Sequence, residues 1–308
     1  MFLKLTTNIT ILTLFLLCFG ACKKDDVTVF EDNTIADYDE VPTILVQNYV
    51  NRLFIDLIGR EPVDLEMDAE VAFLEENDLS SASRAELVDK LMFDETFVEG
   101  DSSYNFAYYQ RIYDGAKARM IDGASEGIIL EDYTIAFNQA IADSMNGNFT
   151  AYEINKTRYE RLQLIMDSKE DLRLGDITID EMFRRLINNS IYDEINMNTF
   201  NFVNASFDDL FYRFPTQEEF DNAFQIIELN QAGNLFGQVA QNKAEYLTIL
   251  TTTPEYFEGM IQWAYLSLLS REPSPNEVFN LIGQFQIDLN YPSVQKSILI
   301  SDEYAGFN

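Results

Sequence analysis

The sequence predicts an all-α fold, a bundle or array of three-helix repeat modules interrupted by a long helical insert. Three observations predict this class. From Val46 onward, apolar residues recur at spacings of three and four, which is the period of a helix. No stretch alternates between apolar and polar residues between two hairpin turns, so we expect no sheet. A motif typical of a helix–corner–helix unit occurs three times.

The first residues have the three parts of a secretory signal. Lys4 lies in a short leading segment, an apolar run follows over residues 9–19, and two small residues precede Cys22. The apolar run is too short to span about 30 Å of hydrocarbon as a permanent helix. We therefore expect residues 1–21 to be removed as a signal peptide.

Cys22 makes this signal specific. Together with the Phe-Gly-Ala before it, Cys22 resembles a bacterial lipobox, in which the thiol accepts a diacylglyceryl group. The resemblance implies a lipoprotein, whose several acyl chains anchor it stably. The alternative is an ordinary cleavable signal that ends at a cysteine. Residues 22–45 are acidic, with few apolar residues and no helical period, and predict a flexible, lipid-anchored tether.

Four charged residues follow the cysteine directly: Lys23, Lys24, Asp25 and Asp26. A basic residue followed by two acids at this position resembles the surface-export signal of Bacteroidetes lipoproteins. The resemblance implies the outer leaflet of the outer membrane, facing the medium. The alternative is a solvated charge cluster within the tether.

The threefold motif predicts three modules. In each copy, an aromatic residue stands six positions before an arginine, a leucine stands three before it, and the arginine begins an Arg-x-Pro-x-x-x-Glu sequence. We expect each module to contain a helix, a sharp corner, a capped helix and a closing helix, over residues 46–100, 198–258 and 259–308. The corner residues are Arg60, Pro62 and Glu66; Arg213, Pro215 and Glu219; and Arg271, Pro273 and Glu277.

Local chemistry explains much of this motif. The proline is expected to end the first helix, because it lacks an N–H group and restricts the residue before it. The arginine is expected in the last turn of that helix, near the exposed carbonyl groups. Thr216 and Ser274, each three residues before a glutamate, predict capping boxes for the next helix. The first copy has Val63 at this position, so we expect Asp64 to act as its cap.

The insert, residues 101–197, predicts long polar and aromatic helices, such as Tyr104 to Met120 and Tyr133 to Met145. Glycines and an Asn-Gly-Asn sequence separate these helices. Three tyrosines in the insert are candidates for a partner-binding surface because interfaces are enriched in this residue. They are Tyr108, Tyr109 and Tyr113.

Composition excludes several classes of function. A net charge of -31 repels nucleic acid and anionic lipid, so we expect no nucleic-acid partner. The chain has no histidine, which removes Ser-His-Asp catalysis, Cys-His catalysis and the His-Glu-x-x-His zinc site. With 52 acidic residues, neighbouring carboxylates arise by chance, and no EF-hand calcium motif is present. We therefore predict no catalytic residue, no metal site and no cofactor.

Both ends of the body resemble the paired domains of unknown function that accompany c-type cytochromes in planctomycetes. The Arg-Leu-x-x-Asp-Leu-x-Gly-x-x-Pro pattern of the first domain matches residues 52–62, and the match continues at 87–91. The Leu-Ser-Arg-Glu-Pro-x-x-x-Glu pattern of the last domain matches 269–277, and its closing Ser-x-Glu-aromatic matches 301–304. The resemblance implies a helical envelope protein rather than a reaction. The Cys-x-x-Cys-His haem motif is missing, so no electron-transfer role is implied.

The corner arginines have two interpretations. They form an anion-binding or partner-binding site, or they clamp one helix to the next, and the capping residues beside them favour the clamp.

The anchor, the repeats and the missing catalytic motifs predict a surface-exposed outer-membrane lipoprotein that is a non-catalytic structural or binding subunit of an envelope complex. Its expected partner, besides the membrane, is an envelope or outer-membrane protein. The alternatives are a lipoprotein that captures a glycan or peptide beside an outer-membrane transporter, and a carboxylate-based hydrolase. A broad apolar patch on the insert favours a partner protein, and an open aromatic groove favours a glycan. Two facing carboxylates about 5–9.5 Å apart favour a hydrolase.

Overall fold

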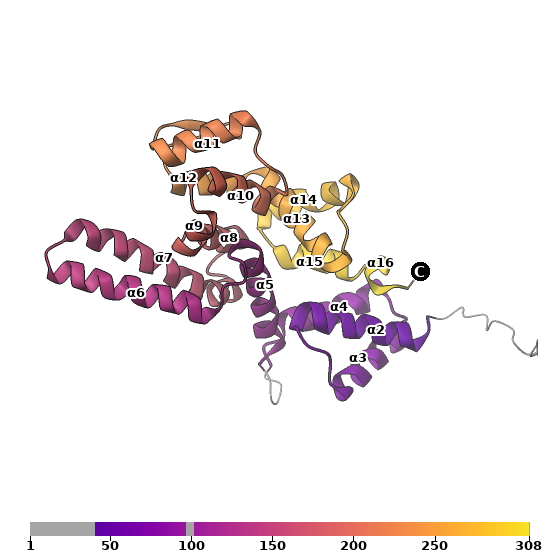
Figure 1. Cartoon of the computed structure of the whole chain (residues 1–308). Helices are drawn as coiled ribbons and strands as arrows, with labels where there is room; N and C mark the ends of the chain where they lie inside the picture. Colours follow the sequence, from indigo (N-terminus) through magenta and orange to yellow (C-terminus); the bar gives the residue numbers. More distant parts are fainter. Residues whose placement is uncertain (1–40, 97–101, 308) are drawn as a thin grey trace, which may run out of the picture. The chain divides into compact units, whose positions relative to one another are not determined.

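The structure is a computed structural model that describes residues 41–96 and 102–307. Helices make up nearly all of its regular structure (Figure 1), which confirms the all-α prediction. The predicted signal peptide, Cys22 and the cluster of Lys23, Lys24, Asp25 and Asp26 lie outside the described residues. Among the helices that are described, none combines the length and apolar character needed to cross a bilayer.

The elements follow the chain in three groups. The first group comprises α2 (Thr43–Leu53), its π-helical continuation η2 (Phe54–Ile58), α3 (Asp64–Glu76) and α4 (Ser81–Phe93). The insert comprises α5 (Tyr104–Met120), α6 (Glu126–Met145), α7 (Phe149–Leu174), α8 (Ile179–Ile187) and α9 (Ser190–Asn196). The last group comprises α10 (Thr199–Phe211), α11 (Gln217–Leu229), β1 (Gly233–Leu235), β2 (Gln238–Ala240), α12 (Lys243–Thr252), α13 (Pro254–Leu269), α14 (Pro275–Asp288), α15 (Tyr291–Leu299) and α16 (Asp302–Ala305).

One small sheet departs from the helical prediction. Strands β1 and β2 pair antiparallel, and Leu235 lies opposite Gln238. Phe236 and Gly237 form the loop between them, with φ angles of 50° and 78°. Two consecutive positive φ angles are typical of a type I′ hairpin turn. The strands are only three residues long, too short for the alternation that identifies a strand in sequence.

The two ends of the described chain pack against each other. The hydroxyl of Tyr49 in α2 donates a 3.1 Å hydrogen bond to the carbonyl oxygen of Leu299. Lys296 in α15 forms an ion pair of 2.6 Å with Asp89 in α4. Residues more than 200 positions apart therefore share one hydrophobic core, which the first and last modules build together.

Helices α10 and α13 cross at short distance because Gly259 has no side chain. A Cβ atom on this residue would overlap the carbonyl oxygen of Leu210. Tyr256 and Met260, which flank the crossing on α13, are buried. This crossing joins the second module to the third, and because α13 begins at Pro254, the boundary predicted between 258 and 259 is wrong by a few residues.

Helices α6 and α7 form an antiparallel hairpin within the insert (Figure 1). Helix α7 also packs against α5 and α8, whereas α6 packs mainly against α7. The predicted helix from Tyr104 to Met120 has the observed bounds of α5. Helix α6 begins at Glu126, seven residues before the predicted start, because Ser125 caps it through a hydrogen bond from the amide of Ile128.

Candidate functional site

The three corner arginines make the same set of contacts. Each guanidinium donates two hydrogen bonds to the glutamate six residues later and one to the carbonyl oxygen of the next residue. In the second corner, Arg213 binds Glu219 at 2.8 and 2.9 Å and the carbonyl oxygen of Phe214 at 3.0 Å. The equivalent bonds join Arg60 to Glu66 and Glu61, and Arg271 to Glu277 and Glu272.

The aromatic residue of each motif lies against its arginine. The guanidinium carbon is 5.5 Å from the ring centroid of Phe54 in the first corner, 5.2 Å from that of Phe207 in the second and 5.0 Å from that of Tyr265 in the third. These distances are in the cation–π range. The ring, the cation and the carboxylate of the repeated motif therefore form one physical unit.

The corners differ in two respects from the sequence prediction. Gly59, Tyr212 and Ser270 are left-handed C-caps, with φ angles of 83°, 56° and 54°, and each cap lies three residues before the proline, so the helix ends four residues before it. Each arginine follows the cap and does not lie in the last turn. The predicted caps Thr216 and Ser274 are confirmed. Asp64 is not the cap of α3, because Val63 holds that position and its amide donates to Glu66.

Two of the corner arginines each bind a second carboxylate as well. Arg213 also binds Glu255, and Arg271 also binds Glu303. Burial raises the pKa of the Glu219 carboxyl, but hydrogen bonds from Arg213 and Thr216 outweigh it and lower this pKa to about 2. The observed geometry favours the clamp interpretation of the corners over an anion site.

The proposed tyrosine surface is wrong in two of its three residues. Tyr108 and Tyr113 are only 1% and 2% exposed, because they point from α5 into the core. The hydroxyl of Tyr108 donates a 2.6 Å hydrogen bond to Gln295, which uses its polar end internally. Tyr109 is half-buried and lines a pocket.

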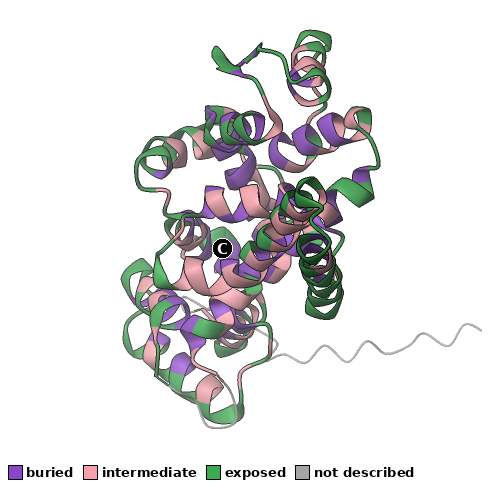
Figure 2. Ribbon diagram, turned by 90° about the vertical axis from the view of Figure 1, so that its left-hand side faces the viewer, coloured by how far each residue is buried: buried purple, intermediate pink, exposed green. Residues whose placement is uncertain are grey.

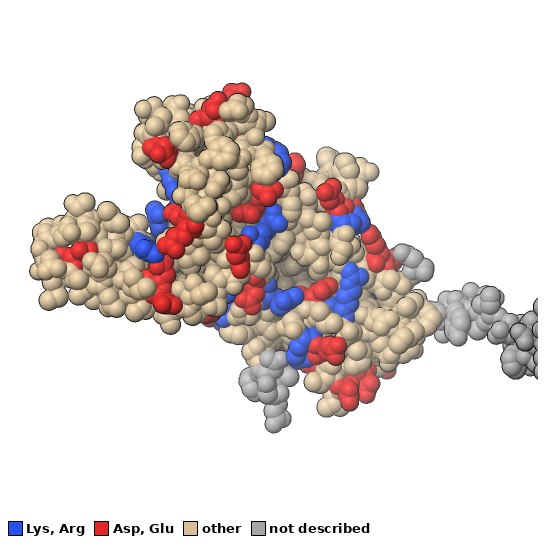
Figure 3. All heavy atoms as spheres, viewed as in Figure 1, with Lys and Arg blue, Asp and Glu red and all other residues tan. Residues whose placement is uncertain are grey.

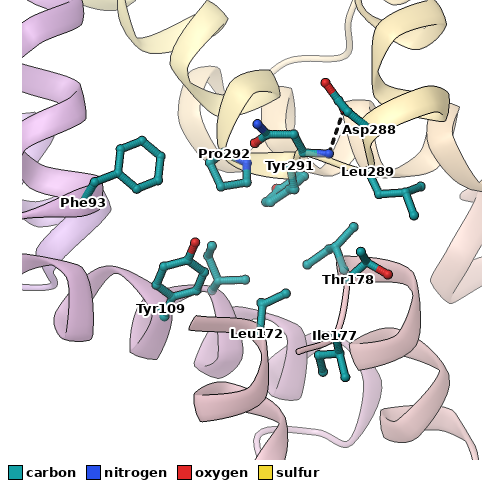
Figure 4. A pocket seen from close by; sticks show the side chains of 12 residues that line it. Phe93, Tyr109, Leu172, Ile177, Thr178, Asp288, Leu289, Tyr291 and Pro292 are labelled. Carbon is teal, nitrogen blue, oxygen red and sulfur yellow. Dashed lines mark hydrogen bonds between the residues drawn. The ribbon is translucent and has the colours of Figure 1, made fainter. Parts of the chain in front are cut away.

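That pocket encloses about 270 Å³ between α4, α5, the loop before α8, and the loop between α14 and α15 (Figure 4). Phe93, Tyr109 and Leu172 face Leu289 and Pro292 across it. The only carboxylate in its lining, Asp288, accepts a 2.9 Å hydrogen bond from the backbone amide of Asn290, as the dashed line in Figure 4 shows. The lining suits an apolar side chain and brings no second acid to the pocket.

A second pocket, of about 140 Å³, lies where η2, α5, α13 and α15 meet. Its polar lining residues include Asp56, Arg111, Ser267 and Gln295, and Trp263 forms part of its wall. Burial raises the pKa of Asp56, although hydrogen bonding from Tyr304 and nearby arginines oppose this shift. The Tyr304 hydroxyl donates to Asp56 at 2.7 Å.

Sequence reasoning missed Asp56 and its counterpart in the second module. Asp56 and Asp209 both stand four residues before a corner arginine. Each accepts a hydrogen bond from a tyrosine hydroxyl. The donor to Asp56 is Tyr304, and the donor to Asp209 is Tyr192, whose hydroxyl oxygen is 2.8 Å from the Asp209 Oδ2 atom. Burial raises the pKa of Asp209 to about 6. Aligning the three copies by their arginines is the signal that finds this pair.

An apolar face lies on the surface of the α6–α7 hairpin. We define it by Leu130, Phe137, Ile141 and Met145, which are 53%, 38%, 44% and 83% exposed. They follow one another along α6 at spacings of seven, four and four, and so lie on one side of the helix. Figure 2 shows exposed residues along this hairpin, and Figure 3 shows its visible surface as mostly uncharged.

Aromatic residues border the apolar face. The ring centroid of Phe137 is 5.9 Å from that of Tyr133 and 5.3 Å from that of Tyr159 on α7. The insert therefore carries exposed aromatic surface, though not on the predicted tyrosines. Further exposed apolar residues of the hairpin are Ile128, Ile135, Phe149, Ile154, Leu164 and Leu174.

Comparisons with known proteins add no constraint. No family model, no curated protein and no solved structure matches the chain. Across residues 41–96 and 102–307, no group of three or more Cys, Asp or Glu side chains is placed to hold a metal ion. What the chain does is therefore inferred from its own surfaces and pockets.

Proposed function

We propose that this chain is a surface-exposed, lipid-anchored outer-membrane protein and a non-catalytic binding subunit of an envelope protein complex. The lipobox-like sequence at Cys22 supports the anchor, and the charge cluster after it supports surface display. The apolar face of α6 is the observation that supports partner binding. It is the broad apolar patch on the insert that a partner protein requires.

The energetics favour a covered face. Burying one large apolar side chain stabilises a complex by about 1.5–3 kcal/mol relative to leaving it in water. Four such side chains on one helix therefore offer several kcal/mol to a partner. Because α6 packs mainly against α7, no other helix of the described chain covers this side.

Charge favours a different protein over a second copy. Two copies of a chain with net charge -31 repel each other, whereas a neutral or basic partner does not. Helix α6 itself carries four acids and no base: Glu126, Glu131, Asp132 and Asp143. The partner we propose is an integral envelope protein with an apolar contact surface and a neutral or basic rim.

The test is a native pull-down of the full-length lipoprotein from detergent-solubilised outer membranes. We expect one integral outer-membrane protein in stoichiometric yield, and its loss with the double substitution Phe137→Ser and Ile141→Ser. The matched control is Phe279→Ser with Ile287→Ser, which removes an equally apolar, exposed pair from α14. Recovery that is equal in both double variants would contradict binding through α6, and recovery of the tagged lipoprotein alone would contradict the subunit proposal.

The pocket at Tyr109 favours the peptide form of the capture alternative. Its apolar and aromatic walls suit one side chain of an extended peptide. A hydrolase would need two facing carboxylates, but this pocket holds only Asp288 and the pocket at Trp263 holds only Asp56. Two acids, Glu153 and Asp193, line a third pocket of about 460 Å³, where Asp193 is already paired with Lys243. We therefore retain peptide capture as the second candidate function.

A further inference from the structure

The 140 Å³ pocket contains several hydrogen-bonding groups that the fold does not use. Arg111 and Arg161 are the only lysines or arginines in the described part of the chain that form neither a hydrogen bond nor an ion pair, and Arg111 lines this pocket. Arg111 is exposed and donates no hydrogen bond to the described residues of the protein, and the opposite charge that it shares this pocket with is Asp56. The donor fork of Arg111 is open to a ligand.

The stem of Arg111 lies over Gly59. A Cβ atom on this glycine would lie 2.9 Å from the Arg111 Cδ atom. Because Gly59 is the left-handed cap of η2, the turn that ends the first helix also leaves room for the arginine. An unpaired arginine is suited to bidentate binding of a carboxylate.

Further donors line the same pocket. Gln295 uses its side-chain oxygen to accept from Tyr108, which leaves its amide donor unused within the described residues. The hydroxyl of Ser267 and the indole N–H of Trp263 likewise make no hydrogen bond there. These groups can bind additional oxygen atoms of a ligand, as a small-molecule site requires.

Asp56 supplies the opposite charge. Its Oδ2 atom accepts a hydrogen bond from Tyr304 and lies 3.7 Å from the Nε atom of Arg52, whereas Oδ1 accepts no hydrogen bond within the described part of the chain. The carboxylate lies on the π-helical segment η2, a type of distortion that is frequent at functional sites. A ligand that contacts both Arg111 and Asp56 therefore needs a carboxylate next to a hydrogen-bond donor, and a positively charged ammonium group suits the anionic Asp56 best.

We propose that this pocket binds an α-amino carboxylate, either a free amino acid or the C-terminal residue of a peptide. Arg111 binds the carboxylate, Asp56 accepts from the adjacent nitrogen, and Ile112, Leu268 and Trp263 contact the side chain. The volume is about half the lower end of drug-sized sites, which fits a single residue. A neutral sugar would not supply the charged, two-oxygen acceptor that a guanidinium fork binds most strongly. The site is separate from the partner-binding face on α6.

The single tryptophan of the chain reports directly on this pocket. We would titrate the full-length protein in detergent micelles with leucine, N-acetyl-leucine and N-acetyl-leucinamide, and record the fluorescence of Trp263. We expect a saturable change with the two carboxylates and none with the amide. Tighter binding of leucine identifies a free amino acid, and tighter binding of N-acetyl-leucine identifies a peptide terminus.

Arg111→Gln is the decisive variant, and Arg161→Gln is its matched control, because both arginines are unpaired. We expect at least a tenfold higher Kd for Arg111→Gln and an unchanged Kd for Arg161→Gln. Circular dichroism checks that both variants fold. Three results would overturn the proposal: no saturable change with either carboxylate, equal binding of the amide, or an unchanged Kd in Arg111→Gln.

Discussion

Each corner arginine joins an aromatic ring at the end of one helix to a glutamate at the start of the next. The guanidinium of Arg213 is only one-third exposed and binds two carboxylates, Glu219 and Glu255. Charge-assisted, bidentate pairs of this kind are the strong hydrogen bonds of proteins. The spacing of the repeated motif thus follows from the reach of one side chain around a turn.

We expect Arg213→Ala to lower the free energy of unfolding by about 2–4 kcal/mol, because it leaves two half-buried carboxylates without their partner. Arg213→Lys keeps the positive charge but loses the planar guanidinium that binds a carboxylate through two hydrogen bonds. We therefore expect this variant to be more stable than Arg213→Ala and less stable than wild type. Urea unfolding of the full chain measures both. Lys156→Ala, which removes an exposed ion pair with Glu160, is the control and should cost less than about 1 kcal/mol.

Asp209 gives stability a pH dependence of known sign. Burial raises its pKa in the folded protein to about 6, above the ordinary value of 3.8. The folded state therefore binds more protons than the unfolded state between these values, and stability falls as pH rises through them. We expect the free energy of unfolding of Asp209→Asn, compared with that of wild type, to increase by about 1–3 kcal/mol as the pH rises from roughly 4 to 7.

Urea unfolding at several pH values measures this difference. The corner glutamates contribute the opposite dependence, because their lowered pKa values make stability fall as pH drops from about 4.5 towards 2. Comparison with wild type cancels that contribution. A constant difference between Asp209→Asn and wild type across the range would show that Asp209 does not titrate with a raised pKa.

At the residue scale, sequence patterns predict what is local. Thr216 and Ser274 were identifiable as caps because their glutamate partners are three residues away. Arg111, Asp56 and Trp263 come together from three different parts of the chain, and no local spacing connects them. The burial of Tyr108 and Tyr113 was equally inaccessible, because it depends on which side of α5 faces the core.

At the element scale, the α10–α13 crossing depends on the absence of a single side chain. Gly259 lets the backbone of α13 approach the carbonyl oxygen of Leu210. Gly283, in α14, is also helical, but a Cβ atom there would meet nothing within 4 Å. The two glycines therefore separate the effect of helix propensity from the effect of close packing.

We expect Gly259→Ala to destabilise the protein by about 3 kcal/mol or more, because the new methyl group forces the helices apart. Gly283→Ala should instead stabilise it by about 0.5–1 kcal/mol, since alanine is the better helix former. Thermal and urea unfolding measure both. If Gly259→Ala were neutral, the close approach of α10 and α13 would be wrong.

Helices were predictable where periodicity and caps agree, as in α5. The β1–β2 hairpin was not, because its strands are three residues long and its turn has Phe236 where Asn is the usual signal. The pattern predicts the start of α6 too late because the first turns of this helix carry apolar residues on the exposed side, which obscures the amphipathic pattern. That exposed side is part of the surface we propose for binding.

At the scale of the whole molecule, the last helices complete the first module. The ring of Tyr304 in α16 lies 6.0 Å from that of Tyr49 in α2, and its hydroxyl binds Asp56. Arg84 and Asp302 form an ion pair of 2.7 Å across the same contact. We infer that the two ends of the body fold as one cooperative unit.

Deletion of residues 300–308 should therefore loosen α2, far away in sequence. We expect faster amide hydrogen exchange over residues 43–58 and an unfolding midpoint at lower urea concentration, because Tyr49 and Asp56 lose their contacts. Exchange in α11, which lies in the second module, serves as the internal reference. Unchanged protection of α2 would contradict the interdependence of the two ends.

We propose a surface lipoprotein whose α6 face is covered by another protein. If Cys22 is lipidated after removal of Cys18, the mature chain has no free thiol, so single-cysteine variants can be labelled cleanly. Ile141→Cys lies on the face, and Gln286→Cys lies at an exposed position of α14. The most direct measurement is their labelling by a membrane-impermeant maleimide on intact cells, before and after dissociation of complexes.

We predict that Gln286→Cys is labelled on intact cells, whereas Ile141→Cys is protected there and becomes reactive once complexes are dissociated. Equal labelling of both positions on intact cells would contradict a covered α6 face. Labelling of neither until the outer membrane is opened would contradict surface display.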